Sequence, residues 1–286
     1  EPLELPEKVK QAKKNNQTII ISVGRLEKQK RFDLMLKAFA QIPKSANALL
    51  IILGEGSLRQ QLEQQIQSLD ISESVMVYRD LALALSLNAR LHIPHVSTKE
   101  SVELIKLFKS KSKLISSEVS PHHLYFCDDD IVGFDTNFKV GPPIRSKNDR
   151  KKLIDGIKSG IIDCIATDHA PHTIEDKETT FNDAEFGMIG LESCFGVVNK
   201  VLVKENGMSL KSLIEKLTVN PRKVMNINTD LFAIGEKAQI TVFNPNEKWT
   251  FSEDDIYSKS SNSPFIGHKL VGRVKYVFSK NSFFSL

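Results

Sequence analysis

The 286-residue chain is poor in cysteine, with only Cys127, Cys164 and Cys194, and their spacing forms no pairs. This pattern excludes a disulfide framework and is typical of reduced thiols in a cytoplasmic protein. The sequence also lacks an apolar run near the roughly 20 residues that a membrane helix needs. Its first 17 residues are polar and charged, and do not resemble a signal peptide. We therefore expect a cytoplasmic protein with no membrane partner.

A strong charge of either sign is missing as well. The 39 basic and 35 acidic residues leave a formal net charge of +4, spread over the whole length. Such a weak, dispersed charge argues against a nucleic-acid partner. Hydrophobic residues make up 41% and charged residues 26%, an ordinary composition for a soluble globular protein. The length suits one large α/β domain or two ordinary ones, and nothing in it predicts an oligomeric state.

One stretch gathers chemically active residues at the end of an apolar run. Residues 160–166 are largely apolar and lead into Asp168, His169 and, after a proline, His172. An acid and two imidazoles at the end of a buried strand are unfavourable in a hydrophobic core. At the carboxyl end of a parallel sheet or barrel, such a cluster can hold a divalent metal and move protons.

The first third of the chain alternates strand and helix patterns. Residues 18–23 and 48–53 are continuous apolar runs typical of buried parallel strands. Amphipathic stripes predict helices at 31–42 and near 58–69, and 75–78 is predicted as a short third strand. This alternation predicts a parallel, right-handed α/β layer.

Two sequence motifs in the first third of the chain resemble those of a known family. VGRLEKQK at 23–30, followed by LGEG at 53–56, resembles the start of the C-terminal nucleotide-binding domain of retaining glycosyltransferases over about residues 17–78. The resemblance implies that Arg25 and Lys30 bind the diphosphate of a nucleotide-sugar donor, and two cations beside a strand-to-helix turn suit that group. The family's later pair of glutamates does not follow. The alternative is that 25–31 is a solvated basic loop.

The pattern continues after residue 79 with further strand and helix units. We predict that Ser97 and Glu100 form a capping box at a helix start. Gly160 is predicted to close a helix that spans 149–159. The predicted elements are a helix at 80–89, strands at 90–96, 113–119 and 161–167, a helix at 208–217, a short helix at 221–225, and strands at 235–243 and 271–278 with a turn at 244–246 between them.

Five sequence motifs in the second part of the chain occur in the same order as in a second protein family. They are HVSTKESV at 95–102, EVSPHHL at 118–124, PPIRS at 142–146, IDCIATDHAPH at 162–172 and FGMIGLE at 186–192. Residues 79–286 closely resemble the C-terminal part of dihydroorotases of the amidohydrolase superfamily. The chain therefore looks like a chimera of two truncated families, joined near residues 78 and 79.

This resemblance implies a (β/α)8 barrel with a binuclear zinc centre at the carboxyl ends of its strands, and hydrolysis of dihydroorotate to N-carbamoyl-aspartate in pyrimidine biosynthesis. It implies that His95 is a metal ligand and that Asp168 is both a ligand and the proton-shuttling acid/base. It further implies that His172 contacts the small-molecule substrate, and that the backbone of Phe186 and Gly187 contacts its ring.

The remaining candidates have plainer interpretations. His122 and His123 are expected to be structural, His92 and His169 to lie in the core or behind the ligands, and Cys164 to pack within its strand. Gly141 stands where the family usually has a substrate-contacting asparagine. Three features of the family's metal site are absent from the sequence: the His-x-His-x-Arg motif, the bridging carboxylate or carbamylated lysine, and the histidine of the fifth strand. Two zinc ligands remain, whereas catalytic zinc sites usually have three protein ligands plus water.

These observations predict an α/β fold in three parts. Residues 1–78 form a Rossmann-like glycosyltransferase-type segment, 79–232 form part of a dihydroorotase-like barrel, and 233–286 form the C-terminal β segment of the small domain. Six parallel strands are expected in all. The predicted function is a zinc-dependent cyclic-amide hydrolase of the dihydroorotase type, impaired by its missing ligands. The alternatives are a nucleotide-sugar glycosyltransferase and a non-catalytic α/β protein.

Overall fold

The computed structural model describes residues 18–23, 35–36, 48–53, 57–58, 72–230, 234, 238–279 and 282–286. The chain divides into two compact units, residues 1–76 and 77–286. The predicted helices at 31–42 and 58–69 lie outside the described residues except for a few positions, and so do Arg25 and Lys30. Within the described ranges, no helix is both long enough and apolar enough to cross a membrane.

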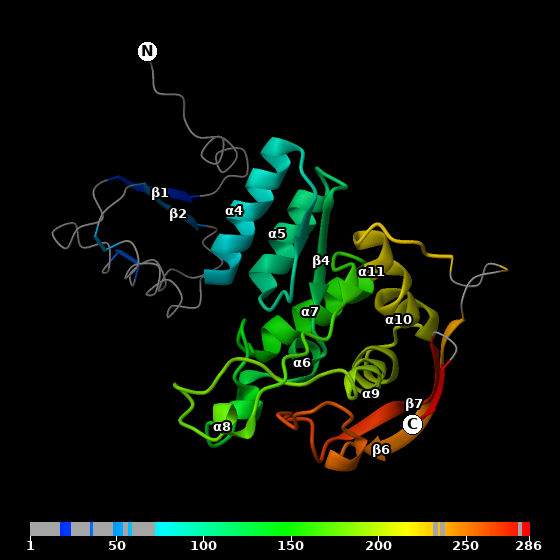
Figure 1. Cartoon of the computed structure of the whole chain (residues 1–286). Coiled ribbons are helices and arrows are strands. Elements are labelled where there is room, and N and C mark those ends of the chain that lie inside the picture. The colour runs from blue at the N-terminus through cyan, green and yellow to red at the C-terminus, as the bar shows by residue number, and fades with distance from the viewer. Residues whose placement is uncertain are drawn as a thin grey trace. The chain divides into compact units, whose positions relative to one another are not determined.

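The first unit contains two of the predicted parallel strands. β1 (Thr18–Val23) pairs with β2 (Ala48–Leu53) in parallel, from Thr18 opposite Ala48 to Val23 opposite Leu53 (Figure 1). Parallel partners cannot be joined by a tight hairpin and need a crossover connection. The two apolar runs therefore form strands at the positions that the sequence predicts.

The predicted strand at 75–78 is wrong, because these residues lie inside helix α4 (Ser72–Leu87). Val77, Leu81 and Ala84 are buried on this helix at positions i, i+4 and i+7, which is the spacing of one helix face. A short apolar run does not distinguish strand from buried helix, and the Ala-Leu repeat that follows favours helix. The described residues consequently contain five parallel strands instead of the expected six, in two separate sheets.

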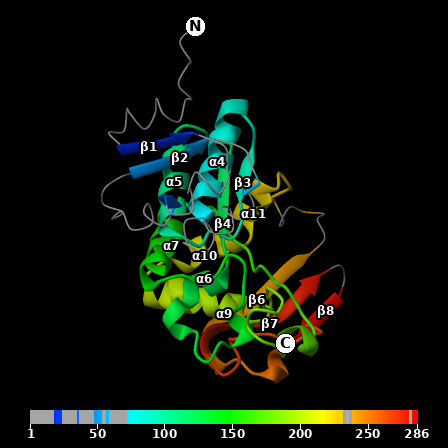
Figure 2. The ribbon, with the colours of Figure 1, turned by 90° about the vertical axis from the view of Figure 1, so that its left-hand side faces the viewer.

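A three-stranded parallel sheet organises the second unit. Its strands are β3 (Leu91–Ile93), β4 (Ile115–Val119) and β5 (Cys164–Ile165), in that order. Figure 2 labels β3 and β4. On β4, the buried residues Ile115, Ser117 and Val119 alternate with the partly exposed Ser116 and Glu118. The buried β4 residues Ile115 and Val119 pack in one core cluster with α5 (Lys99–Lys109) and α7 (Lys147–Ser159), whose buried residues include Val102, Ile105, Phe108, Leu153 and Ile157.

The helix caps follow the predictions with one correction. Thr98, not Ser97, is the N-cap of α5, and its hydroxyl accepts a hydrogen bond from the Ser101 amide at 3.2 Å. Ser97 is instead buried, and its hydroxyl accepts from Arg145 Nε at 3.0 Å. Both residues can cap, so the choice is made by the tertiary contact with Arg145. Gly160 ends α7 at φ 82°, the left-handed conformation expected of a C-terminal glycine.

The C-terminal part adds short helices and an antiparallel sheet. β6 (Gln239–Thr250), β7 (Lys269–Ser279) and β8 (Ser282–Ser285) pair in that order. The predicted turn at 244–246 is wrong: these residues lie inside β6, where the pairing with β7 shifts between Asn244 and Lys248. Proline cannot donate to the ladder, and a local bulge accommodates it without ending the strand.

The other elements are short. They are α6 (Pro121–Tyr125), α8 (Ile174–Lys177), α9 (Cys194–Val198), the π-helix at Asn199–Glu205, α10 (Leu210–Leu217), α11 (Val219–Val224), and single 3₁₀ turns at Asp128–Asp130, Thr136–Phe138 and Glu253–Asp255. A second core cluster of Phe126, Phe138, Met188, Phe251 and Phe265 packs the C-terminal sheet region against the loops that follow α6.

The packing of α5 predicts different costs for two neighbouring substitutions. Ile105 is fully buried, and Ile105→Ala should lower the free energy of unfolding by about 2–5 kcal/mol through lost burial and a cavity. Leu107 on the same helix is 38% exposed, and Leu107→Ala should cost less than about 1 kcal/mol. Urea unfolding followed by circular dichroism measures both. Equal costs would contradict this packing.

Candidate active site

Two of the predicted site residues lie just beyond the carboxyl ends of parallel strands. His95 follows β3 and Asp168 follows β5, and both adopt positive φ angles, 31° and 50°. Side chains other than glycine rarely adopt this region, and such strained positions cluster at functional sites. The chain therefore leaves both strands by an unusual turn at the residues that the sequence marks as ligands.

The two side chains interact electrostatically. Burial raises the pKa of the Asp168 carboxyl, His95 lowers it, and the Glu118 carboxylate raises it. An opposite charge shifts a pKa in this way only at short range. The structure thus brings His95, Asp168 and Glu118 into one neighbourhood at the carboxyl edge of the sheet.

The adjacent histidines of α6 are committed to hydrogen bonds. His123 Nε2 donates to the Pro142 carbonyl at 3.0 Å, which leaves its Nδ1 to accept from the Ser120 hydroxyl at 2.6 Å. Ser120 Oγ then accepts from His122 Nε2 at 2.8 Å. Burial, followed by the charges of His123 and His95, holds the pKa of His122 well below its usual value. His122 is therefore a neutral donor whose Nε2 lies 3.9 Å from Asp168 Oδ2, and this bonding pattern suits a structural role.

His172, Phe186 and Gly187 come together in a second group. His172 Nε2 donates to the Phe186 carbonyl at 3.0 Å, and the His172 amide donates to Asn262 Oδ1 at 3.1 Å. The Gly187 amide donates to the Lys139 carbonyl at 2.8 Å. The imidazole and the backbone of this loop are thereby fixed in orientation before any ligand binds.

Phe186 lines a hollow of about 330 Å³ together with Lys139, Pro143 and Phe181. Lys139 Nζ lies 4.5 Å from the centre of the Phe186 ring, a cation–π contact. A Cβ atom at Gly141 would lie 3.6 Å from Phe186 Cδ1. A larger residue at position 141, such as the asparagine usual in the resembling family, would therefore contact this ring.

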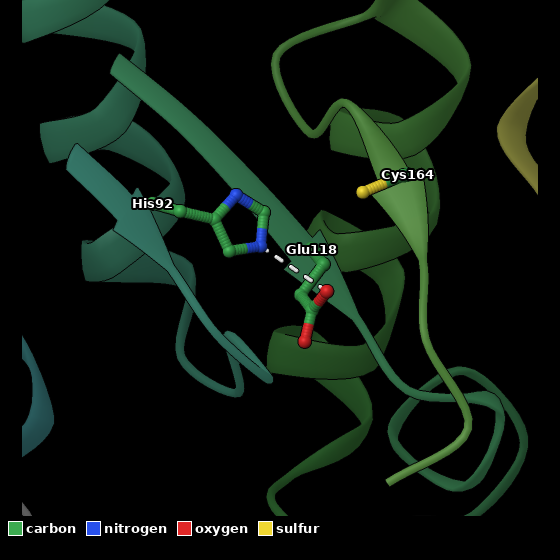
Figure 3. A group of neighbouring side chains, drawn as sticks. All are labelled: His92, Glu118 and Cys164. Carbon is green, nitrogen blue, oxygen red and sulfur yellow. Dashed lines mark ion pairs between the residues drawn. The ribbon is translucent and has the colours of Figure 1, made fainter. Parts of the chain in front are cut away.

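Sequence reasoning missed a third group on the same sheet. His92, Glu118 and Cys164 come from β3, β4 and β5, and one ligand atom of each lies within 4.8 Å of the others (Figure 3). His92 Nε2 is 3.1 Å from Glu118 Oε2. Cys164 is buried in its strand as expected, and it lies with His92 beside Glu118. No signal within one segment marks the group, because the pairing and register of three strands bring it together.

The implied binuclear zinc centre does not fit the described residues. His95 and Asp168 are the two ligands that the dihydroorotase resemblance implies, and the nearby His122 Nε2 is a donor to Ser120. A catalytic zinc normally has three protein ligands, and two ions need more. Another candidate group, formed by Cys127, Asp128 and Asp129, is exposed apart from its thiol, which bonds to Asp130 at 3.3 Å.

Comparison with solved structures defines the class of fold. A D-hydantoinase from Bacillus sp. AR9 superposes with a TM-score of 0.70 at 21% identity, over 97% of this chain and 66% of that one. A dihydropyrimidinase from Brevibacillus agri NCHU1002 gives 0.70 at 20% identity, over the same shares. The expected fold class is confirmed: the parallel βα units are those of a partial hydantoinase-like barrel.

Comparison with curated proteins names the particular relatives. The chain is similar to dihydroorotases of Caldicellulosiruptor saccharolyticus (42% identical over 206 residues, 72% of this chain and 48% of the relative) and Clostridioides difficile (43% over 206 residues, 72% and 48%). The Bacillus subtilis dihydroorotase is 42% identical over 202 residues, 71% and 47% of the two chains. The chain spans about half the length of the curated relatives it matches.

The first part of the chain matches a different family model. Residues 5–111 match the model "Glycosyl transferases group 1". Both resemblances predicted from the sequence are therefore confirmed, one to glycosyltransferases and one to dihydroorotases. The matched range extends past residue 78, where we placed the junction, into β3 and α5.

The neighbourhood of Asp168 predicts opposite pKa changes in two variants of the metal-free protein. Burial should place the pKa of the Asp168 carboxyl above its ordinary value of about 3.9. His95→Asn should raise this pKa further by removing a cation, whereas Glu118→Gln should lower it by removing an anion. A ¹³C NMR titration of the carboxyl carbon measures all three proteins. Shifts of the opposite sign would contradict the geometry.

The loop backbone predicts a second result. Gly187 has φ 145°, and an added Cβ would lie 2.5 Å from Ala170 Cβ and 3.0 Å from His172 Nε2. Gly207 has φ 68° with open space around it, so alanine there meets only the backbone strain of about 1–2 kcal/mol. Gly187→Ala should therefore lower the melting temperature more than Gly207→Ala and shift the His172 imidazole NMR signals. Unchanged His172 signals would show that the loop is not packed as described.

Proposed function

We propose that the chain is a dihydroorotase-like, metal-dependent cyclic-amide hydrolase with zinc as its metal, of the type that converts dihydroorotate to N-carbamoyl-aspartate in pyrimidine biosynthesis. The observation that carries the proposal is the position of His95 and Asp168, which follow β3 and β5 in left-handed conformations at the carboxyl edge of the β3–β4–β5 sheet. The similarity to dihydroorotases supports it. A small-molecule substrate, a cytoplasmic location, and the absence of nucleic-acid and membrane partners belong to the same proposal.

Asp168 has the chemistry for proton transfer in this reaction. Opening a cyclic amide requires a proton to leave the attacking water and another to reach the departing nitrogen. A carboxylate whose pKa is raised by burial is a better base than an exposed one, and a larger fraction of it holds a proton to donate near neutral pH. Asp168 can perform both transfers in sequence from one position.

The second group of residues would position the substrate. His172 would donate its Nε2–H to a substrate carboxylate or carbonyl in place of the Phe186 carbonyl, which accepts it in the free protein, and the backbone of Phe186 and Gly187 would contact the dihydropyrimidine ring. The bonds of the His172 amide to Asn262 and of the Gly187 amide to Lys139 would reduce the ordering required when the substrate binds. A zinc ion held in part by His95 and Asp168 would supply water activation and carbonyl polarisation.

Two features favour impaired activity in this chain alone. The described residues supply two of the expected zinc ligands, and the chain spans about half the length of its dihydroorotase relatives. A centre with missing ligands binds zinc weakly, because each lost ligand removes part of the chelate. We therefore expect weak or no turnover.

The second candidate function is transfer of a sugar from a nucleotide-sugar donor. It is favoured by the match of residues 5–111 to a glycosyltransferase model. Arg25 and Lys30 would bind the donor diphosphate in that case. The family's paired glutamates do not occur after them, which weighs against this candidate. A third hypothesis is that the chain is a non-catalytic α/β protein that retains site residues without a working metal centre.

A dihydroorotate hydrolysis assay on the zinc-supplemented chain tests the first candidate. We expect weak or no turnover, and any residual rate should fall about 100-fold or more in Asp168→Ala, the usual scale for a lost general acid/base. Asp155→Ala on the exposed side of α7 serves as the control and should leave the rate unchanged.

Other outcomes would favour other functions. Full turnover with two tightly bound zinc ions, abolished by Asp168→Ala, would show that the metal centre is complete and the view of an impaired enzyme wrong. Zinc-free protein that binds a nucleoside diphosphate, and loses it in Arg25→Ala or Lys30→Ala, would favour the glycosyltransferase.

A further inference from the structure

The register of the parallel sheet places three metal-ligand side chains on one face. His92 is opposite Ser116 across β3 and β4, and Cys164 is opposite Glu118 across β4 and β5. Directly opposed residues in a sheet point to the same side, and so do residues two apart on one strand. His92, Glu118 and Cys164 therefore converge because of the backbone pairing and not through chance rotamers (Figure 3).

His92 has a polar partner at each ring nitrogen. Its Nδ1 lies 2.8 Å from Ser116 Oγ, which in turn lies 3.4 Å from the Leu91 carbonyl oxygen. Its Nε2 lies 3.1 Å from Glu118 Oε2. In the metal-free protein a proton lies between Nε2 and the carboxylate, and a metal ion bound by both groups would replace that proton.

The distances suit a metal ion. Two nitrogen or oxygen ligands at about 2.0 Å from a tetrahedral zinc lie roughly 3.3 Å apart. The 3.1 Å separation of His92 Nε2 and Glu118 Oε2 is close to this value. The three ligand atoms all lie within 4.8 Å of one another, so small side-chain rotations bring Sγ into range. His92 and Glu118 are partly exposed, which gives an ion access, while Cys164 is buried.

We propose that His92 Nε2, the Glu118 carboxylate and Cys164 Sγ bind one zinc-like divalent ion, at a site separate from the His95–Asp168 pair. Three protein ligands of mixed nitrogen, oxygen and sulfur type leave a fourth position for water. As the sulfur–metal bond forms, the Cys164 thiol releases its proton to solvent. The site does not depend on dihydroorotate hydrolysis, because it uses none of the residues assigned to that reaction.

The surroundings of Cys164 indicate how the ion competes with protons. Burial, with the Glu118 and Asp163 carboxylates, raises the pKa of the Cys164 thiol to about 12. The metal-free protein therefore keeps a neutral thiol at neutral pH, and a soft divalent ion must displace that proton. The cations Lys109 and Lys216 act in the opposite sense, although Lys109 is paired with Asp163 at 2.7 Å.

Cobalt(II) substitution tests the site on the full chain, because sulfur bonded to cobalt gives a charge-transfer absorption that nitrogen and oxygen ligands do not give. One equivalent of Co²⁺ should produce this band, and Zn²⁺ should displace it. Cys164→Ser should abolish the band and weaken Co²⁺ affinity at least tenfold. Glu118→Gln should keep the band and weaken affinity to a similar extent. Circular dichroism checks that each variant folds.

Matched controls separate this site from the others. Cys194→Ser and Cys127→Ser should keep the band, and Asp168→Ala should also keep it while removing any hydrolysis. A band that survives Cys164→Ser, or its absence in wild-type protein mixed with Co²⁺, would overturn the proposal. If Cys164→Ser does not fold, His92→Gln decides: unchanged Co²⁺ affinity would overturn the site, and a tenfold loss would support it.

Discussion

The parallel register of β3, β4 and β5 is the constraint on which the described site depends. It turns Ile115 and Val119 towards the core shared with α5 and α7, and turns Glu118 to the opposite face. An ion pair holds the register, because Lys109 Nζ lies 2.7 Å from the Asp163 carboxylate, which accepts from the Ser117 amide of β4 at 2.9 Å. A one-residue slip would exchange the two faces and disperse every candidate ligand.

The same sheet supports two kinds of chemistry at its carboxyl end. His95 and Asp168 leave their strands in left-handed turns and form the pair that we assign to amide hydrolysis. His92, Glu118 and Cys164 lie earlier on the same strands and form the group that we assign to a single ion. Glu118 connects them, since its charge raises the pKa of Asp168. An ion bound to Glu118 would therefore also change the proton affinity of Asp168.

Much of the fold could be predicted from local pattern, because apolar runs and caps act within a few residues. β1, β2, β4 and the Gly160 helix end illustrate this. The helical structure of residues 75–78 could not be predicted in this way, because a four-residue apolar run fits a strand and a helix equally. Burial of Leu81 on the same helix face favours the helix. The role of His92 and Cys164 depends on which strands pair and in what register. No single segment of the sequence contains that information. His95 and Asp168, in contrast, each lie in a motif that resembles the dihydroorotase family.

X-ray absorption at the zinc edge, on the chain loaded with one equivalent of zinc, tests most directly whether the sheet register builds a metal site. The expected result is a single ion with one sulfur ligand at about 2.3 Å and two or three nitrogen or oxygen ligands at about 2.0–2.2 Å. A shell with no sulfur, or a second zinc close to the first, would contradict it. A shell with no sulfur would show that Cys164 is not a ligand, and a second zinc close to the first would show a binuclear centre.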